Sequence, residues 1–110
     1  MSPFFVYLTP DAEKDLIEIR DYISLMLKMP DTAKRYLHFL HEQIGNLCFM
    51  PERFPLMDTQ PWRSLGVRSF IAKNFLIYYR INDEKKIVFI LNIIYRKRDQ
   101  LTALRCLHSV

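Results

Sequence analysis

Six basic side chains in the second half of the chain are the residues best suited to chemistry with an anion. They are Arg68, Lys73, Arg80, Arg96, Lys97 and Arg98. Residues 61–110 carry ten Lys/Arg and three Asp/Glu, a net charge of +7, whereas residues 1–60 carry six and nine, a net charge of −3. This asymmetry predicts an anionic partner, either nucleic acid or an acidic protein segment. The alternative is that these cations only keep the edge of a sheet soluble.

Other chemical signatures in the sequence are weak. His38, His41 and Glu42 have a spacing that a metal site could use, but a third ligand group is not obvious, so we expect a solvated helix face. Cys48 and Cys106 do not make a disulfide framework, and we expect reduced thiols. Two glycines are too few for a phosphate-binding loop. We therefore expect neither a metal nor a cofactor.

A first strand and a helical hairpin are predicted before the basic residues. Residues 4–8 are aromatic and β-branched, which is typical of a strand. Thr9 and Pro10 then suit the N-cap and first position of a helix. Two apolar stripes at helical spacing predict helices over about 10–28 and 31–49 that pair as an antiparallel hairpin. The first stripe is Ala12, Leu16, Ile19, Ile23 and Met26, and the second is Ala33, Leu37, Leu40, Ile44 and Leu47.

The rest of the chain predicts an irregular connection followed by an antiparallel meander. Three prolines interrupt residues 49–64, where Phe49, Phe54 and Trp62 are expected to pin the segment against the domain rather than to stack on bases. Together the elements predict one α+β domain over residues 1–110, with the sheet packed on the helices. The predicted strands cover residues 67–71, 75–81 and 87–95, and the pattern of residues 99–110 allows a short C-terminal helix.

The meander would bring part of the basic set together. In antiparallel order the end of the second strand meets the start of the third, and the end of the fourth lies beside that start. Lys73 and residues 96–98 should therefore gather at one end of the sheet. Arg68 would extend this cluster only if its strand faces the right way.

Several segments of the chain resemble the RelE/ParE superfamily of toxins from bacterial type II toxin–antitoxin pairs. Residues 47–55 resemble its connection L…P.RFP, and residues 66–68 resemble the entry to its second strand. Residues 73–81, KNFLIYYRI, resemble the ParE-type strand NYLI.YRI, and residues 90–99, ILNIIYRKRD, resemble its strand IL.I.H..RD. The order of strand, helical hairpin and meander is also similar, so the resemblance covers nearly the whole chain.

The two branches of this superfamily act differently: RelE-like members cut mRNA on the ribosome, and ParE-like members inhibit DNA gyrase. RelE-like enzymes resemble one another in an arginine inside the third strand and often a Tyr or His near the C-terminus. Here Leu76 and Ile77 stand at the strand positions, and Thr102 stands about where the tyrosine would be. The chain therefore resembles the ParE branch more closely, with Tyr95 at the usual histidine position.

The resemblance implies a gyrase-inhibiting toxin with a role in plasmid stabilisation. Its target-binding residues would be Arg68, Lys73, Arg80, Arg96, Lys97 and Arg98. Three alternatives stay open: a RelE-like ribosome-dependent nuclease, a non-toxic module that only binds an antitoxin, and a nonspecific nucleic-acid binder with steep salt dependence. A nuclease would need cations and proton donors around the phosphate, and its catalytic residues would be Arg68, Tyr95, Arg96 and Arg98.

The resemblance also implies a cognate antitoxin and a toxin–antitoxin hetero-oligomer. The basic charge predicts an antitoxin segment rich in Asp or Glu near residues 96–98. That partner would bind as a helix in an apolar groove or as an extended segment added to the sheet edge. The sequence has no run of about 18 apolar residues and no signal-peptide pattern, so we expect a cytoplasmic protein without membrane contact.

Overall fold

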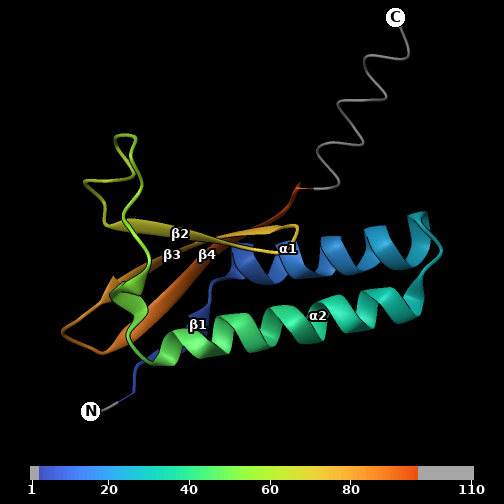
Figure 1. The fold of residues 1–110 in the computed structure, drawn as a ribbon, viewed down its shortest axis with the longest axis horizontal. Helices are drawn as coiled ribbons and strands as arrows, with labels where there is room; N and C mark the ends of the chain where they lie inside the picture. Colours follow the sequence, from blue (N-terminus) through green and yellow to red (C-terminus); the bar gives the residue numbers. More distant parts are fainter. Residues whose placement is uncertain (1–2, 97–110) are drawn as a thin grey trace, which may run out of the picture.

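The computed structural model describes residues 3–96 and contains one strand, two helices and three further strands (Figure 1). This order confirms the predicted α+β fold. The C-terminal helix predicted over residues 99–110 lies outside the described residues, as do Lys97 and Arg98. The elements are β1 at Phe5–Leu8, α1 at Pro10–Asp21, α2 at Pro30–Gly45, β2 at Val67–Ala72, β3 at Phe75–Asn82 and β4 at Ile87–Tyr95.

The four strands form one mixed sheet in the order β1-β4-β3-β2. β2, β3 and β4 make the predicted antiparallel meander, with Phe75 opposite both Ala72 and Tyr95. β1 lies parallel to β4, from Phe5 opposite Ile87 onwards. Parallel neighbours need a long crossover, which the helical hairpin and the β2–β3 hairpin supply together.

The start of α1 replaces β1 along the edge of β4. Thr9 N donates to Ile90 O over 3.1 Å, and the Thr9 hydroxyl lies 2.7 Å from the same oxygen. Asp15 Oδ2 accepts a hydrogen bond from Ile93 N over 2.9 Å. Thr9 also caps α1, because its Oγ1 accepts from Ala12 N. These bonds satisfy backbone groups of β4 that the short β1 does not reach.

The first helix ends earlier than predicted. A π-helical turn at Tyr22–Met26 follows α1, and Leu27 N donates to Tyr22 O five residues back. The wider turn shifts the phase of the helix. Ile23 is still buried as predicted. Met26, at the end of the wider turn, is 67% exposed and lies outside its predicted apolar stripe.

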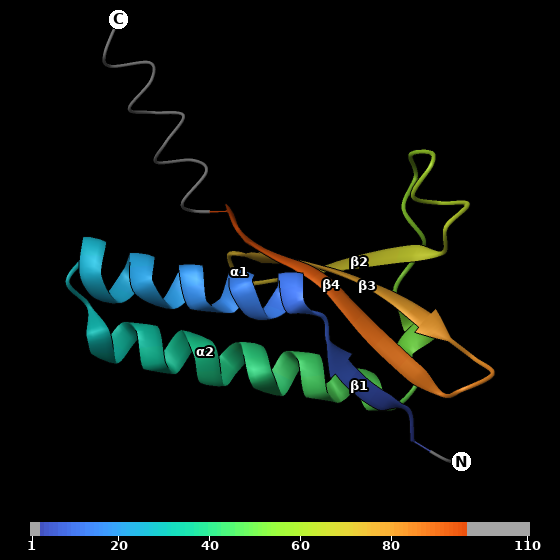
Figure 2. The same ribbon diagram turned by 180° about the vertical axis from the view of Figure 1, so that it is seen from behind.

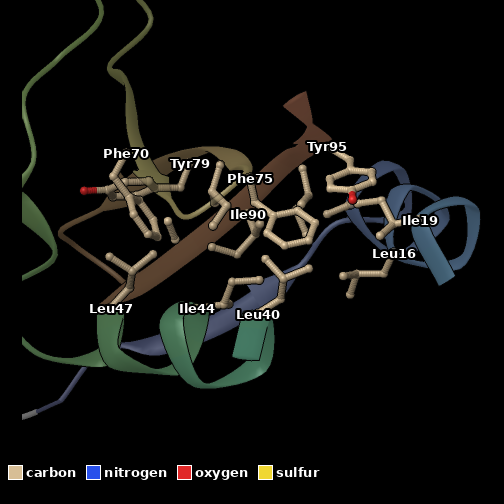
Figure 3. Packing of buried hydrophobic residues seen from close by; sticks show 14 of the residues in the cluster. Leu16, Ile19, Leu40, Ile44, Leu47, Phe70, Phe75, Tyr79, Ile90 and Tyr95 are labelled. Carbon is tan, nitrogen blue, oxygen red and sulfur yellow. The ribbon is translucent and has the colours of Figure 1, made fainter. Parts of the chain in front are cut away.

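Both helices cover one face of the sheet, as the two opposite views show (Figures 1 and 2). The side chains of α1 and α2 meet those of β3 and β4 in a single core (Figure 3). Tyr79, Phe75, Leu40, Ile77 and Ile90 are each at most 1% exposed. We call this covered face the inner face of the sheet, and the opposite face the outer face.

Candidate binding surface

Lys73 and Arg96 lie at the same end of the sheet, as the meander predicts. Lys73 occupies the β2–β3 turn with a left-handed backbone, φ 54°. Arg96 N donates to the carbonyl of Asn74 in that turn over 2.7 Å. The Lys73 ammonium lies over the ring of Phe39 on α2, 4.3 Å from its centroid, and Arg96 is exposed. We call Lys73 and Arg96 the turn-end cations.

Arg68 does not join the turn-end cations. It lies opposite Tyr79, near the end of β2 that is remote from the β2–β3 turn. Its guanidinium donates to the carbonyl oxygens of Glu52 and Phe54. Hydrogen bonds from a charged donor are strong, so Arg68 holds the connection between α2 and β2 in place. Arg68 therefore contacts the connection between α2 and β2 and lies apart from the turn-end cations.

Tyr79 reinforces the same connection. Its buried hydroxyl donates to Pro51 O over 2.6 Å. Burial raises the pKa of Tyr79 to about 12, and the nearby Arg68 lowers that pKa by a smaller amount. The Phe54 ring stacks on Phe70 with centroids 4.5 Å apart, which confirms its predicted role as a pin. Phe49 and Trp62 are pins of a weaker kind than predicted, since they are 56% and 50% exposed, and Trp62 lies over the outer face of the sheet with Tyr78 and Leu91.

Tyr95 packs inside the core at the base of the turn-end cations. It is 4% exposed and stacks on Phe75 with ring centroids 5.1 Å apart (Figure 3). Burial raises the pKa of its hydroxyl, with smaller contributions from Tyr36 and Tyr22. Tyr95 and Arg68 thus lie apart from each other: Tyr95 packs in the core against Tyr22, and Arg68 lies at the remote end of β2.

Arg80 lies on the outer face, where it is exposed. Its guanidinium is 5.8 Å from the ring centroid of Phe89, its neighbour on β4. Arg80 also borders a hollow of about 430 Å³ between the outer face and residues 57–65, which we call the outer hollow. Its lining consists of Met57, Trp62, Leu65, Val67, Tyr78, Arg80, Leu91 and Asn92.

The wall of the outer hollow was not predicted from the sequence. Met57 and Leu65 give no periodic signal, and Trp62 was expected only to pin the segment against the domain. The available signal was composition: the segment that holds Trp62 has neither strand nor helix periodicity and contains Arg63 beside the aromatic ring. Exposed tryptophan next to arginine is typical of binding surfaces.

His38 and Glu42, two of the three residues considered for a metal site, contact each other on α2. His38 Nε2 lies 3.1 Å from Glu42 Oε1, and both side chains are mostly exposed. Across residues 3–96 no group of three potential ligands is placed to hold a metal ion. Within the same residues no helix is long and apolar enough to cross a membrane.

The sequence matches the family described as ParE toxin of type II toxin-antitoxin system, parDE, over residues 6–100. The chain belongs to this toxin family. The RelE/ParE-type resemblance of its strands is thereby confirmed. No curated protein sequence matches this ParE-family chain.

Solved structures share the fold of this ParE-family chain. The toxin–antitoxin complex RelBE2 from Mycobacterium tuberculosis has a TM-score of 0.63 at 24% identity, and the match covers 87% of this chain and 94% of that one. The chromosomal ParDE system from P. aeruginosa has a TM-score of 0.66 at 24% identity, covering 84% and 95%. A mutant of the E. coli toxin RelE in the free state has a TM-score of 0.57 at 12% identity, covering 92% of each chain.

Proposed function

We propose that this ParE-family toxin inhibits DNA gyrase and does not cut RNA. The observation that carries the proposal is the burial of Tyr95, the tyrosine next to Arg96 in the chain. Its ring is stacked on Phe75 and the residue is 4% exposed, so Tyr95 is part of the core and not of the exposed surface that Arg96 presents. Basic side chains without a proton-transfer partner can bind an anionic target, whereas RNA cleavage also needs an acid and a base.

In this proposal the surface that binds gyrase is the turn end of the sheet. Lys73 and Arg96 lie there, and Lys97 and Arg98 follow in the chain. RelE-like enzymes resemble one another in having an arginine inside the third strand, and here Leu76 and Ile77 stand at those positions. This difference also favours the gyrase branch. Gyrase is an intracellular target, so the proposal includes a cytoplasmic location and a role in plasmid stabilisation.

Supercoiling of relaxed plasmid by purified gyrase tests this proposal. The wild-type chain should inhibit supercoiling. The variant Arg96→Glu should need a higher concentration for the same inhibition, because it reverses an exposed charge at the turn end of the sheet. Lys85→Glu is the matched control, since Lys85 is an exposed cation between β3 and β4, at the opposite end of the sheet from the turn-end cations. Absence of inhibition by the wild type, together with codon-positioned mRNA cuts on ribosomes, would assign the chain to the RelE-like branch instead.

Expression of the chain alone in a bacterium separates a toxin from an inert antitoxin-binding module. The proposal predicts growth arrest that co-expression of the cognate antitoxin relieves. Normal growth with confirmed soluble protein would identify a non-toxic module.

The partner in this proposal is a short acidic antitoxin, which the neighbouring reading frame would encode. Its Asp- and Glu-rich segment would contact Arg96 and Arg98. The double substitution Arg96→Glu with Arg98→Glu should then weaken the complex, and unchanged affinity would remove this contact from the account.

A further inference from the structure

The outer hollow combines apolar walls with a single cation. Trp62 and Leu65 are 50% and 55% exposed on its wall, although both are large apolar side chains. Tyr78 and Leu91 form its floor on the uncovered face of the sheet. A hollow of about 430 Å³ lined in this way has the size and polarity of a protein ligand site.

The wall of the outer hollow is held in place by its own hydrogen bonds. Val67 N donates to Trp62 O over 3.0 Å, and Met57 N donates to Val67 O over 2.9 Å, so both ends of the wall are bonded to the first residue of β2. Ser64 N donates to the side-chain oxygen of Gln60 over 3.0 Å. A site that is already ordered loses less conformational entropy when it binds a partner.

The charge of the outer hollow selects an anionic partner. Among the described residues that line it, Arg80 is the one charged residue and none is acidic. Within residues 3–96, Arg80 has no carboxylate within 4.0 Å, and the ring of Phe89 supports one side of its guanidinium. An arginine on an aromatic ring presents its remaining donors as a planar fork, which matches a carboxylate.

We propose that the outer hollow is the anchor site for an amphipathic, acidic segment of the antitoxin. A large apolar side chain of that segment fills the space between Trp62, Leu65 and Tyr78, and a neighbouring Asp or Glu pairs with Arg80. This contact rests on the proposed function, and it is separate from the contact at the turn-end cations. It gives the antitoxin an apolar anchor that the exposed turn end does not offer.

A peptide segment fits the outer hollow better than a nucleic acid does. Nucleic-acid binding depends on several Lys or Arg side chains along a phosphate backbone. The hollow offers one such side chain among mostly apolar neighbours. Buried aromatic and arginine anchors, by contrast, are the residues that dominate protein–protein affinity.

Calorimetric titration of the full-length chain with the short protein encoded by its neighbouring reading frame tests the anchor site. Trp62→Ala should weaken binding on the order of 10-fold or more, because a half-exposed aromatic anchor is lost. Arg80→Glu should weaken it at least as much, and Arg80→Lys should fall between Arg80→Glu and the wild type. Ile71→Ala is the matched control, since Ile71 is a 60% exposed apolar residue of β2 that does not line the hollow.

Wild-type affinity in both Trp62→Ala and Arg80→Glu would overturn the anchor site and leave the toxin assignment intact. Loss of binding in Ile71→Ala to the same extent would also overturn it, because the effect would then not be specific to the hollow. No binding by the wild type would refute the antitoxin partnership itself. Equal unfolding midpoints in urea for all four variants and the wild type establish that any loss comes from the interface.

Discussion

Alternate residues of β3 belong to two different environments. Phe75, Ile77 and Tyr79 point to the inner face and are at most 1% exposed. The residues between them, Leu76 and Tyr78, are only partly buried on the outer face. A sheet covered by helices on one side alone can keep its stability on that side and leave the other available for a partner.

The arginines of the sheet divide in the same way. Arg68 donates to two carbonyl oxygens of the connection that precedes β2. Arg80 lies on the outer face over Phe89, beside the outer hollow. The same residue type thus contributes to stability at one position and is available for binding at the other, and only the contacts distinguish the two.

Truncation of one isoleucine on each side of the sheet should give the largest difference. Ile77→Ala should lower the free energy of unfolding by about 2–5 kcal/mol, because Ile77 is fully buried and its truncation leaves a cavity. Ile71→Ala should change it by less than about 0.5 kcal/mol, since Ile71 is 60% exposed. Urea unfolding measures both. Equal losses would contradict the assignment of stability to the inner face.

High pH should destabilise the fold through Tyr79. Its pKa is about 12 in the folded chain and 10.0 without burial, so the folded state keeps the proton longer. The stabilisation is complete below pH 10 and is lost as the pH rises from 10 through 12, by about 2–3 kcal/mol in total. Unfolding free energies across this range measure the slope. Tyr79→Phe has no proton to lose and should show a shallower slope, whereas a wild-type slope in this variant would remove Tyr79 as the cause.

Removal of the two arginines should separate stability from binding. Arg68→Ala should cost about 1–3 kcal/mol of unfolding free energy, because the carbonyls of Glu52 and Phe54 lose a charged donor. Arg80→Ala should cost less than about 0.5 kcal/mol, since its only described contact is the ring of Phe89. Thermal unfolding of both variants checks this order, and the reverse order would show that Arg80 is a structural residue.

A smaller effect is expected at the edge of β4. Asp15→Ala should cost about 1 kcal/mol, because Ile93 N, beyond the end of β1, loses its side-chain acceptor. Asp11→Ala, an exposed carboxylate in the same helix, is the control. A loss at Asp11 as large as that at Asp15 would attribute the effect to helix charge rather than to the edge bond.

Local patterns predicted the elements well, because strands and helices bury residues at fixed periods. The second apolar stripe follows from the helical period, and the fourth strand follows from a continuous run of apolar residues. The prediction for Met26 was wrong, since the π-helical turn that ends at Met26 changes the phase of the helix without a sequence signal. The separation of Arg68 from the turn-end cations could not be predicted from the sequence either. The position of Arg68 relative to residues 51–54 depends on how the connection between α2 and β2 folds back.

The outer hollow could not be predicted from the sequence for the same reason. Its wall and its floor lie far apart in the chain, and they meet only because Trp62 and Met57 are both bonded to Val67. Hydrophobic periodicity records which residues face a core, but it carries no information about an irregular segment that folds over the opposite face.

Backbone amide hydrogen exchange of the toxin, alone and bound to its antitoxin, tests most directly whether the outer face is the binding face. Binding should slow exchange most at residues 57–66 and in the strand segments beneath them. Slowing concentrated at the tip of the helical hairpin, around Leu25 and Met26, with unchanged exchange at residues 57–66, would contradict it.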